Sequence, residues 1–123
     1  MGKKRILVID DERDFIKVMT DFLESAGYNV ISADDGLEGL EQVRSKKPDL
    51  IILDLMLPKL DGLVLCGLLK KDVRYARIPV IMFTGREAQE DMVTGKKVGA
   101  DAYMTKPQEP TRLLEKIKEL LIE

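Results

Sequence analysis

Five polar residues stand at the ends of short apolar runs in this chain, and their types fit one kind of chemistry. They are three aspartates, a threonine and a lysine: Asp10, Asp11, Asp54, Thr84 and Lys106. If the runs are neighbouring parallel strands, their carboxyl ends bring these side chains to the edge of the sheet where ligands bind in open α/β folds. Three carboxylates resist joint ionisation unless a cation is present. The set therefore indicates a hard divalent metal with an anion beside it, and a phosphoryl group on Asp54 is the interpretation that uses every member.

Each of these residues also has an ordinary structural interpretation. Asp10 and Asp11 could simply begin a helix, because acidic side chains favour its positive end. Asp54 and Thr84 could cap a turn or a helix, and Lys106 taken alone would be a surface lysine. The common position of all five at the ends of apolar runs is what favours a single functional site.

Strand and helix patterns alternate five times along the chain. Strands are expected at residues 4–10, 28–33, 50–53, 78–83 and 101–105, and apolar residues at helical spacing follow them within 15–23, 37–43, 63–69, 87–98 and 113–121. Asp35 is a candidate N-cap, and Gly27 and Gly99 are candidate helix ends. Regular alternation of this kind implies a parallel sheet with helices on both faces.

Composition excludes several classes of function. The chain has 123 residues, enough for one domain with its own core, and its net charge of −2 gives no general attraction to nucleic acid or membranes. The apolar run after the basic start is too short for a signal peptide or a membrane span. The single cysteine, Cys66, allows no internal disulfide and is expected in the core. A cytoplasmic protein is therefore expected.

The chain contains no histidine. This excludes Ser-His-Asp catalysis, Cys-His catalysis and zinc held by histidine. Any histidine that takes part in the chemistry must belong to a partner.

The sequence closely resembles the receiver domain of bacterial two-component response regulators, over essentially its whole length. The residues that carry the resemblance are ILVIDDE in the first apolar run, LIILDLMLPKLDG around Asp54, and the positions of Thr84 and Lys106-Pro107. The resemblance implies that residues 1–123 form one receiver domain. The implied fold is the flavodoxin-like, doubly wound (βα)5 architecture, with a five-stranded parallel sheet of order 2-1-3-4-5 and helices on both faces.

The resemblance also implies a role for each acidic residue. Asp54 matches the phosphoacceptor, and Asp11 matches the residue that ligates Mg²⁺ directly, with Asp10 acting beside it directly or through water. The backbone carbonyl of Met56 matches a further metal ligand. The implied cofactor is Mg²⁺, for which Mn²⁺ could substitute.

The remaining matches concern switching. Thr84 matches the switch hydroxyl, Tyr103 the aromatic switch residue and Lys106 the lysine that pairs with the phosphoryl group. Lys106-Pro107 looks like the cis peptide of the family. Phosphorylation is then expected to bias the surface built from the fourth helix, the last strand and the last helix.

Some positions bear on rate and assembly. Met56 and Arg86 match the positions that flank the phosphoryl group and tend to set its lifetime, and an apolar and a long side chain there predict slow self-hydrolysis. Gln108 stands where a phenylalanine is common. Ala102 stands where many transcription-factor receivers carry a second acidic residue, which puts their charge-paired dimer in doubt, so a phosphorylation-dependent homodimer is only one possibility.

Several functions remain to be separated. The favoured one is a phosphoacceptor signalling domain and not a classical enzyme. It is expected to receive its phosphoryl group from a histidine kinase or a histidine phosphotransfer protein. A phosphohydrolase of the haloacid dehalogenase type would place an aspartate where Met56 stands, and a flavin binder would need a Ser/Thr/Gly-rich loop where Asp-Asp-Glu stands. A pseudo-receiver that binds partners without phosphorylation is the other alternative. No output segment is recognisable, so a stand-alone receiver or an excised domain is expected, without direct contact to nucleic acid or membrane.

Overall fold

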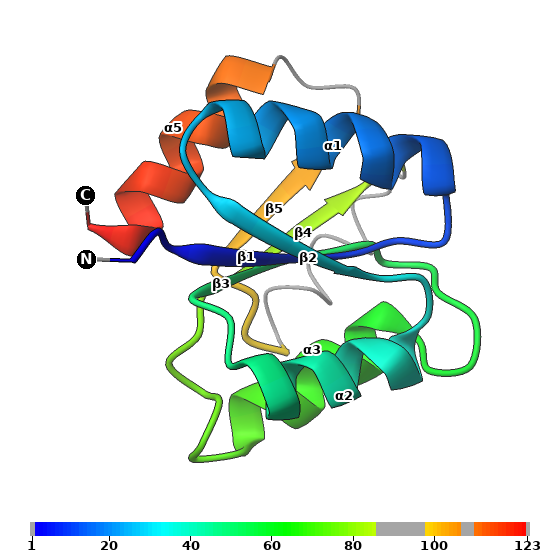
Figure 1. The fold of residues 1–123 in the computed structure, drawn as a ribbon. Coiled ribbons are helices and arrows are strands. Elements are labelled where there is room, and N and C mark those ends of the chain that lie inside the picture. Colours follow the sequence, from blue (N-terminus) through cyan, green and yellow to red (C-terminus); the bar gives the residue numbers. More distant parts are fainter. Residues whose placement is uncertain (1, 86–97, 107–109, 123) are drawn as a thin grey trace.

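The computed structural model describes residues 2–85, 98–106 and 110–122 (Figure 1). Strands and helices alternate along the chain as the sequence predicts. They are β1 Arg5–Ile9, α1 Arg13–Ser25, β2 Asn29–Ala33, α2 Gly36–Lys46, β3 Leu50–Leu53, α3 Gly62–Lys71, β4 Val80–Thr84, β5 Ala102–Thr105 and α5 Pro110–Leu121. The helix expected at residues 87–98 lies outside the described residues, apart from its last position.

The five strands form one parallel sheet of order β2-β1-β3-β4-β5, which confirms the predicted topology. The order reverses between β1 and β3, and such a switch point opens a crevice at the carboxyl ends of the strands. The register aligns these ends, because Ile9 pairs with Leu53 and Thr84 pairs with Thr105. Residues that follow the strands are therefore brought to one edge of the sheet.

Two layers of helices enclose the sheet. In Figure 1, α1 and α5 lie over one face and α2 and α3 over the other. Side chains of β1 alternate between them: Ile6 and Val8 belong to the cluster under α1 and α5, whereas Leu7 and Ile9 belong to the cluster with α3. All four are fully buried. Burial on both faces explains why the strands read as continuous apolar runs.

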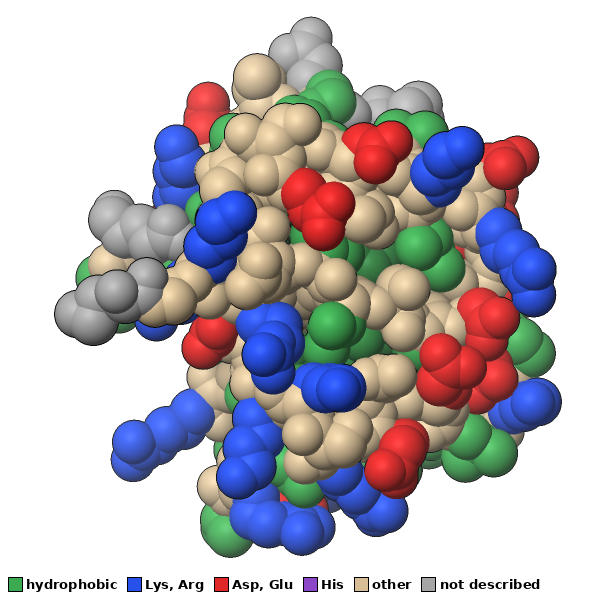
Figure 2. Space-filling view, in the orientation of Figure 1, with side chains coloured by type: hydrophobic (Ala, Val, Ile, Leu, Met, Phe, Trp, Pro, Cys, Tyr) green, Lys and Arg blue, Asp and Glu red, His purple; other side chains and the backbone are tan. Residues whose placement is uncertain are grey.

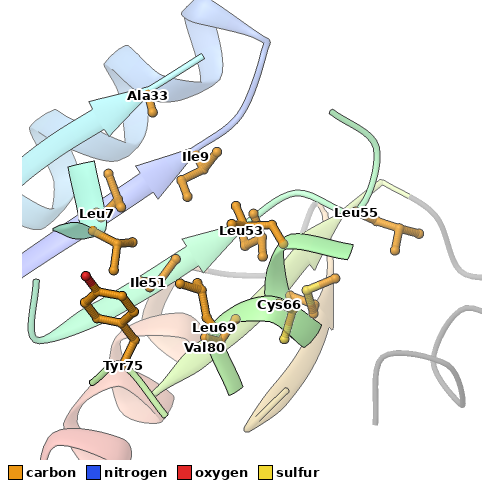
Figure 3. Packing of buried hydrophobic residues seen from close by; sticks show 13 residues of the cluster. Leu7, Ile9, Ala33, Ile51, Leu53, Leu55, Cys66, Leu69, Tyr75 and Val80 are labelled. Carbon is orange, nitrogen blue, oxygen red and sulfur yellow. The ribbon is translucent and has the colours of Figure 1, made fainter. Parts of the chain in front are cut away.

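The second of these clusters is shown in Figure 3. Leu7 and Ile51 of the sheet lie opposite Leu69 and Cys66 of α3, with Tyr75 closing one end. Cys66 is a core residue as predicted, and burial raises the pKa of its thiol to about 11. The thiol therefore stays protonated and unreactive at neutral pH.

Local signals in the sequence mostly hold. The Asp35 carboxylate caps α2 by accepting a hydrogen bond of 2.8 Å from the Glu38 N–H, and α1 ends at Ser25 just before Gly27, whose φ is +101°. The largest error in a strand boundary is at β4, which begins at Val80 and not at residue 78, whereas other strand ends differ by one residue. The Ile78 carbonyl instead accepts a hydrogen bond from the Lys70 ammonium. Among the helices described, none combines the length and apolar character needed to cross a membrane.

Candidate functional site

Two buried carboxylates and one ammonium meet at the carboxyl ends of the central strands. Asp10 follows β1 and Asp54 follows β3. The Asp54 N–H donates to the Ile9 carbonyl at 3.0 Å, which holds the ends of these two strands together. Asp10 is 0% and Asp54 7% exposed. Lys106 follows β5, and its Nζ lies 2.6 Å from Asp10 Oδ2 and 3.6 Å from Asp54 Oδ2. Residues far apart in sequence thus lie together at one site.

A third carboxylate belongs to Glu12, which the sequence analysis did not single out. Its Oε1 lies 3.3 Å from Lys106 Nζ, and carboxylate oxygens of Asp10, Glu12 and Asp54 all lie within 4.8 Å of one another. Asp11 is exposed and belongs to no acidic group among the described residues.

A local turn explains why Glu12, and not Asp11, lies in the acidic cluster with Asp10 and Asp54. The Asp10 Oδ1 accepts a hydrogen bond of 2.9 Å from the Glu12 N–H, and aspartate favours such a bond to the backbone two residues on. The preference of aspartate for this turn was the available sequence signal for Glu12.

The charges of the acidic cluster and Lys106 do not balance. Burial raises the pKa of Asp10, although the Lys106 ammonium and the Glu12 N–H oppose this. Burial works against the Lys106 ammonium as well, but the hydrogen bond to Asp10 and the charge of Asp54 raise the pKa of Lys106. One ammonium therefore faces three carboxylates, and the site has an excess of negative charge.

This donor set fits a hard divalent cation. Mg²⁺ prefers carboxylate, carbonyl and water oxygens and is usually held by only one or two carboxylates. Asp10 and Asp54, with Glu12 beside them, supply oxygen atoms close enough together for such an ion. The acidic cluster that the sequence predicts is therefore present, with Glu12 in the group and Asp11 outside it.

A second acidic group has structural partners that explain it. Asp34, Asp35 and Glu38 lie together near the start of α2. Asp35 caps that helix and pairs with Lys59 at 3.4 Å, and Asp34 lies 3.9 Å from Arg13. Burial and the neighbouring Asp34 raise the pKa of Glu38.

The loop after β3 holds the Asp54 side chain from one side. The Met56 N–H donates to Asp54 Oδ1 at 3.4 Å, and Met56 itself is 55% exposed. Gly62, at the start of α3, returns the chain so closely that a Cβ there would collide with the Asp54 carbonyl oxygen. Only glycine fits at this position.

The proposed switch residues lie on β4 and β5. Thr84 is the last residue of β4 and pairs in the backbone with Thr105, next to Lys106. Tyr103 is half-buried and packs against the cluster of Figure 3. The Thr84 side chain, Arg86, Gln108 and the Lys106-Pro107 peptide lie outside the described part of the chain.

Tyr103 also lines a pocket between β5 and α5. The pocket has a volume of about 390 Å³, and its walls are Tyr103, Met104, Thr105, Arg112, Glu115, Lys116 and Glu119. It lies on two of the three elements expected to change on phosphorylation.

One aromatic residue joins the site unexpectedly. Phe15 was identified only as part of the apolar stripe of α1, but the Lys106 Nζ lies 4.0 Å from the centroid of its ring. Helical spacing gives no indication that an apolar side chain will face a lysine more than ninety positions away, because that contact depends on the packing of α1 against the strand ends.

Comparison with known proteins gives a consistent family. The profile of the response regulator receiver domain matches residues 6–118. The transcriptional regulatory protein PhoP for alkaline phosphatase synthesis in Bacillus subtilis is 43% identical over 118 residues, which cover 96% of this chain and 48% of that protein. The regulator RpaA of Synechocystis is 44% identical, over 95% of this chain and 48% of its own length. The chain thus spans about half the length of these curated relatives.

Solved structures of receiver domains are also similar to this chain. A CheY-like receiver domain protein from Methanospirillum hungatei is 36% identical, with a TM-score of 0.92 and coverage of 98% of this chain and 95% of that one. The receiver domain of a sensor histidine kinase from Pseudomonas aeruginosa is 25% identical, with a TM-score of 0.90 and full coverage of both chains. That structure contains a magnesium ion coordinated in the active-site cleft.

Proposed function

Because this chain belongs to the response regulator receiver family of two-component systems, we propose that Asp54 is the residue that accepts the phosphoryl group. The donor is a phosphohistidine on a histidine kinase or a histidine phosphotransfer protein, since the chain itself has no histidine. The observation that carries this assignment is the position of Asp54: it is buried at the switch point of the sheet, with the Lys106 ammonium 3.6 Å away.

The transfer forms one bond and breaks one bond. An Asp54 carboxylate oxygen attacks phosphorus, and the P–N bond of the donor breaks, with its electron pair passing to the imidazole nitrogen, which then takes a proton. Lys106 stabilises negative charge on the phosphoryl oxygens as a point charge. Thr84 is proposed to donate a hydrogen bond to another of these oxygens.

Mg²⁺, when bound, neutralises charge on the phosphoryl group and on the carboxylates. Its proposed ligands are Asp10, Asp11, Asp54 and the Met56 carbonyl, and the position of Glu12 adds it as a candidate. Support comes from the oxygen-rich cluster and from the magnesium-containing relative. Mn²⁺ offers similar chemistry and could substitute.

Phosphorylation is proposed to change the surface built from the fourth helix, β5 and α5. Thr84 moves toward the phosphoryl group, and Tyr103 turns inward to fill the space that it leaves. The pocket beside Tyr103 supports this hypothesis, because a shift of the ring would alter a surface that α5 shares. The recipient is a downstream output domain or protein, or a second copy of the chain in a phosphorylation-dependent homodimer.

The lifetime of the aspartyl phosphate is proposed to be long. Met56 lies two residues after Asp54 and its side chain is apolar and exposed, so we propose that it hinders an approaching water molecule. Arg86 is assigned the same role by its position in the sequence, and Lys106-Pro107 is proposed to be cis. Slow autodephosphorylation is thus the only hydrolytic activity we assign.

The rest of the signalling system is also a proposal. Relatives named as transcriptional regulators are about twice as long as this chain, so any contact with DNA is assigned to their other half and not to this domain. A cytoplasmic location without membrane contact fits that role. A phosphohydrolase is not favoured because Met56 stands at its acid position, and a pseudo-receiver is not favoured because Asp54 and Lys106 are both in place.

The decisive experiment is phosphorylation by acetyl phosphate with Mg²⁺, followed by intact-mass measurement. Wild type and Asp14→Asn, which changes an exposed aspartate of α1, should each gain the mass of one phosphoryl group. Asp54→Asn should gain none. A phosphorylated Asp54→Asn protein would show that another residue is the acceptor.

A further inference from the structure

We propose that Phe15 is a positioning residue whose ring holds the Lys106 ammonium against the carboxylates during phosphotransfer. The proposal rests on the function proposed above and adds a residue to it. The Lys106 Nζ lies 4.0 Å from the centroid of the Phe15 ring while it bonds to Asp10 Oδ2 at 2.6 Å. An ammonium within about 6 Å of an aromatic centroid is attracted by the negative face of the ring.

The Phe15 ring is held in place by a second aromatic ring, that of Phe83. Phe15 lies in the first turns of α1, and its ring packs against that of Phe83 with centroids 5.7 Å apart and planes inclined by 41°. Phe83 is 4% exposed and belongs to β4, one residue before Thr84. Phe15 therefore connects the core under α1 with the ammonium at the site.

The surroundings strengthen this contact. The Lys106 side chain is 14% exposed, so water competes little for the ammonium, and cation–π attraction grows when the cation is desolvated.

A neutral support is useful because the charged ones change during the reaction. Asp54 would become the acyl phosphate, and Asp10 would also hold the metal when it is bound. The lysine stem is flexible, and a point charge on it has no preferred direction. The Phe15 ring changes neither charge nor bonding, so it keeps the ammonium in place while its carboxylate partners change.

The test uses four substitutions. Phe15→Leu keeps an apolar side chain but removes the aromatic face, and Phe15→Tyr restores that face. Phe22→Leu is the matched control, because Phe22 lies on the same helix and packs against the same core cluster. Lys106→Met identifies the lysine signals.

The first measurement is NMR of the lysine ε-methylene protons. A ring above the ammonium moves the Lys106 signals upfield in wild type, Phe15→Tyr and Phe22→Leu, and the shift should disappear in Phe15→Leu. This readout needs no phosphorylation, and a general loosening of the core would not produce it selectively.

The second measurement is the rate of phosphorylation by acetyl phosphate. We expect a rate about five-fold lower in Phe15→Leu and within about two-fold of wild type in Phe15→Tyr and Phe22→Leu.

Three results would overturn the proposal: a Lys106 shift that survives in Phe15→Leu, an unchanged rate in that variant, or an equal loss of rate in Phe22→Leu. If wild type takes no phosphoryl group, the proposed function fails and the positioning role with it, whereas the NMR result still reports separately on the ring contact.

Discussion

Two lysines at opposite ends of the sheet have the same burial and different surroundings. The side chains of Lys70 and Lys106 are each 14% exposed. Lys70, at the end of α3, pairs with Asp101 at 2.8 Å and donates to the Ala76 and Ile78 carbonyls at 3.1 and 2.7 Å. Its three donors match three acceptors, only one of which is charged.

Lys106 lies in the opposite situation. Within residues 2–85, 98–106 and 110–122, its polar partners are the three carboxylates of Asp10, Glu12 and Asp54. An ammonium with one carboxylate and two carbonyls forms a neutral, saturated structural contact, whereas an ammonium with three carboxylates leaves excess negative charge that a second cation can share. Burial alone therefore does not separate a structural lysine from a functional one, but the charge of its partners does.

The two ends also differ on the surface. In Figure 2, acidic side chains gather on the side toward which the strands of Figure 1 point, and basic side chains gather near the opposite ends of α2 and α3. Basic residues in the last turns, Arg44 and Lys46 of α2 and Lys70 and Lys71 of α3, account for part of that difference. Cations favour helix C-termini, so the basic end has a local structural explanation.

The largest expected difference concerns phosphorylation. Lys106→Met should lower the rate of phosphorylation by acetyl phosphate about 100- to 1,000-fold, because charge on the transferring group loses its nearest fixed cation. Lys70→Met should stay within about two-fold of wild type when measured well below its unfolding temperature. Equal losses in the two variants would remove the functional distinction between the lysines.

The next effect is on stability at the Lys70 end. Lys70→Met should lower the free energy of unfolding by about 2 kcal/mol, because the Asp101 carboxylate and two carbonyls lose their shared donor. Urea unfolding measures this, with Lys71→Met, at an exposed neighbouring position, as the control. A loss no larger than that of Lys71→Met would show that the Lys70 contacts contribute little.

Stabilisation of the protein by metal should depend on the carboxylates near Lys106 and not on the one near Lys70. Mg²⁺ at ten times its dissociation constant should raise the free energy of unfolding by about 1.4 kcal/mol, and EDTA should reverse the effect. Asp10→Asn should reduce this gain, whereas Asp101→Asn at the Lys70 end should keep it. An unchanged gain in Asp10→Asn would exclude Asp10 as a ligand.

The smallest effect is a dependence on pH in metal-free buffer. Because burial raises the pKa of Asp10, its contribution to stability is fully present below the unfolded value of 3.8 and is lost as pH rises through the folded value. Asp10→Asn should therefore be more stable than wild type at pH 7 by about 1 kcal/mol, and the advantage should shrink toward pH 4. Unfolding curves at several pH values would reveal an error if the difference stayed constant.

The fold was accessible from sequence because its signals are local. Continuous apolar runs, the Asp35 cap and the turn at Gly27 are each readable within a few residues, and they gave the strands and the described helices. The error at residue 78 shows the limit of such local signals. An apolar residue was assigned to β4, but the Lys70 ammonium takes its carbonyl, and no short-range pattern reveals that contact.

The site was accessible only in part. Strand ends indicated Asp10, Asp54 and Lys106, and these three do lie together. Glu12 and Phe15 were not singled out, because their positions depend on a turn at Asp10 and on how α1 packs against β4. The roles assigned to Asp10, Asp54 and Lys106 stay predictions, as do those of Asp11, Met56, Thr84, Arg86 and Tyr103.

The order of residue types along the chain was enough to determine a parallel sheet and the residues that follow its strands, because alternation and strand ends are properties of neighbouring positions. Tertiary structure alone decided which partners each charge would have. Lys70 and Lys106 look alike in sequence, and only the folded chain gave Lys70 two carbonyls and one carboxylate and gave Lys106 three carboxylates. Electrostatic energy depends on distance in space and on exclusion of water, and neither is a property of sequence separation.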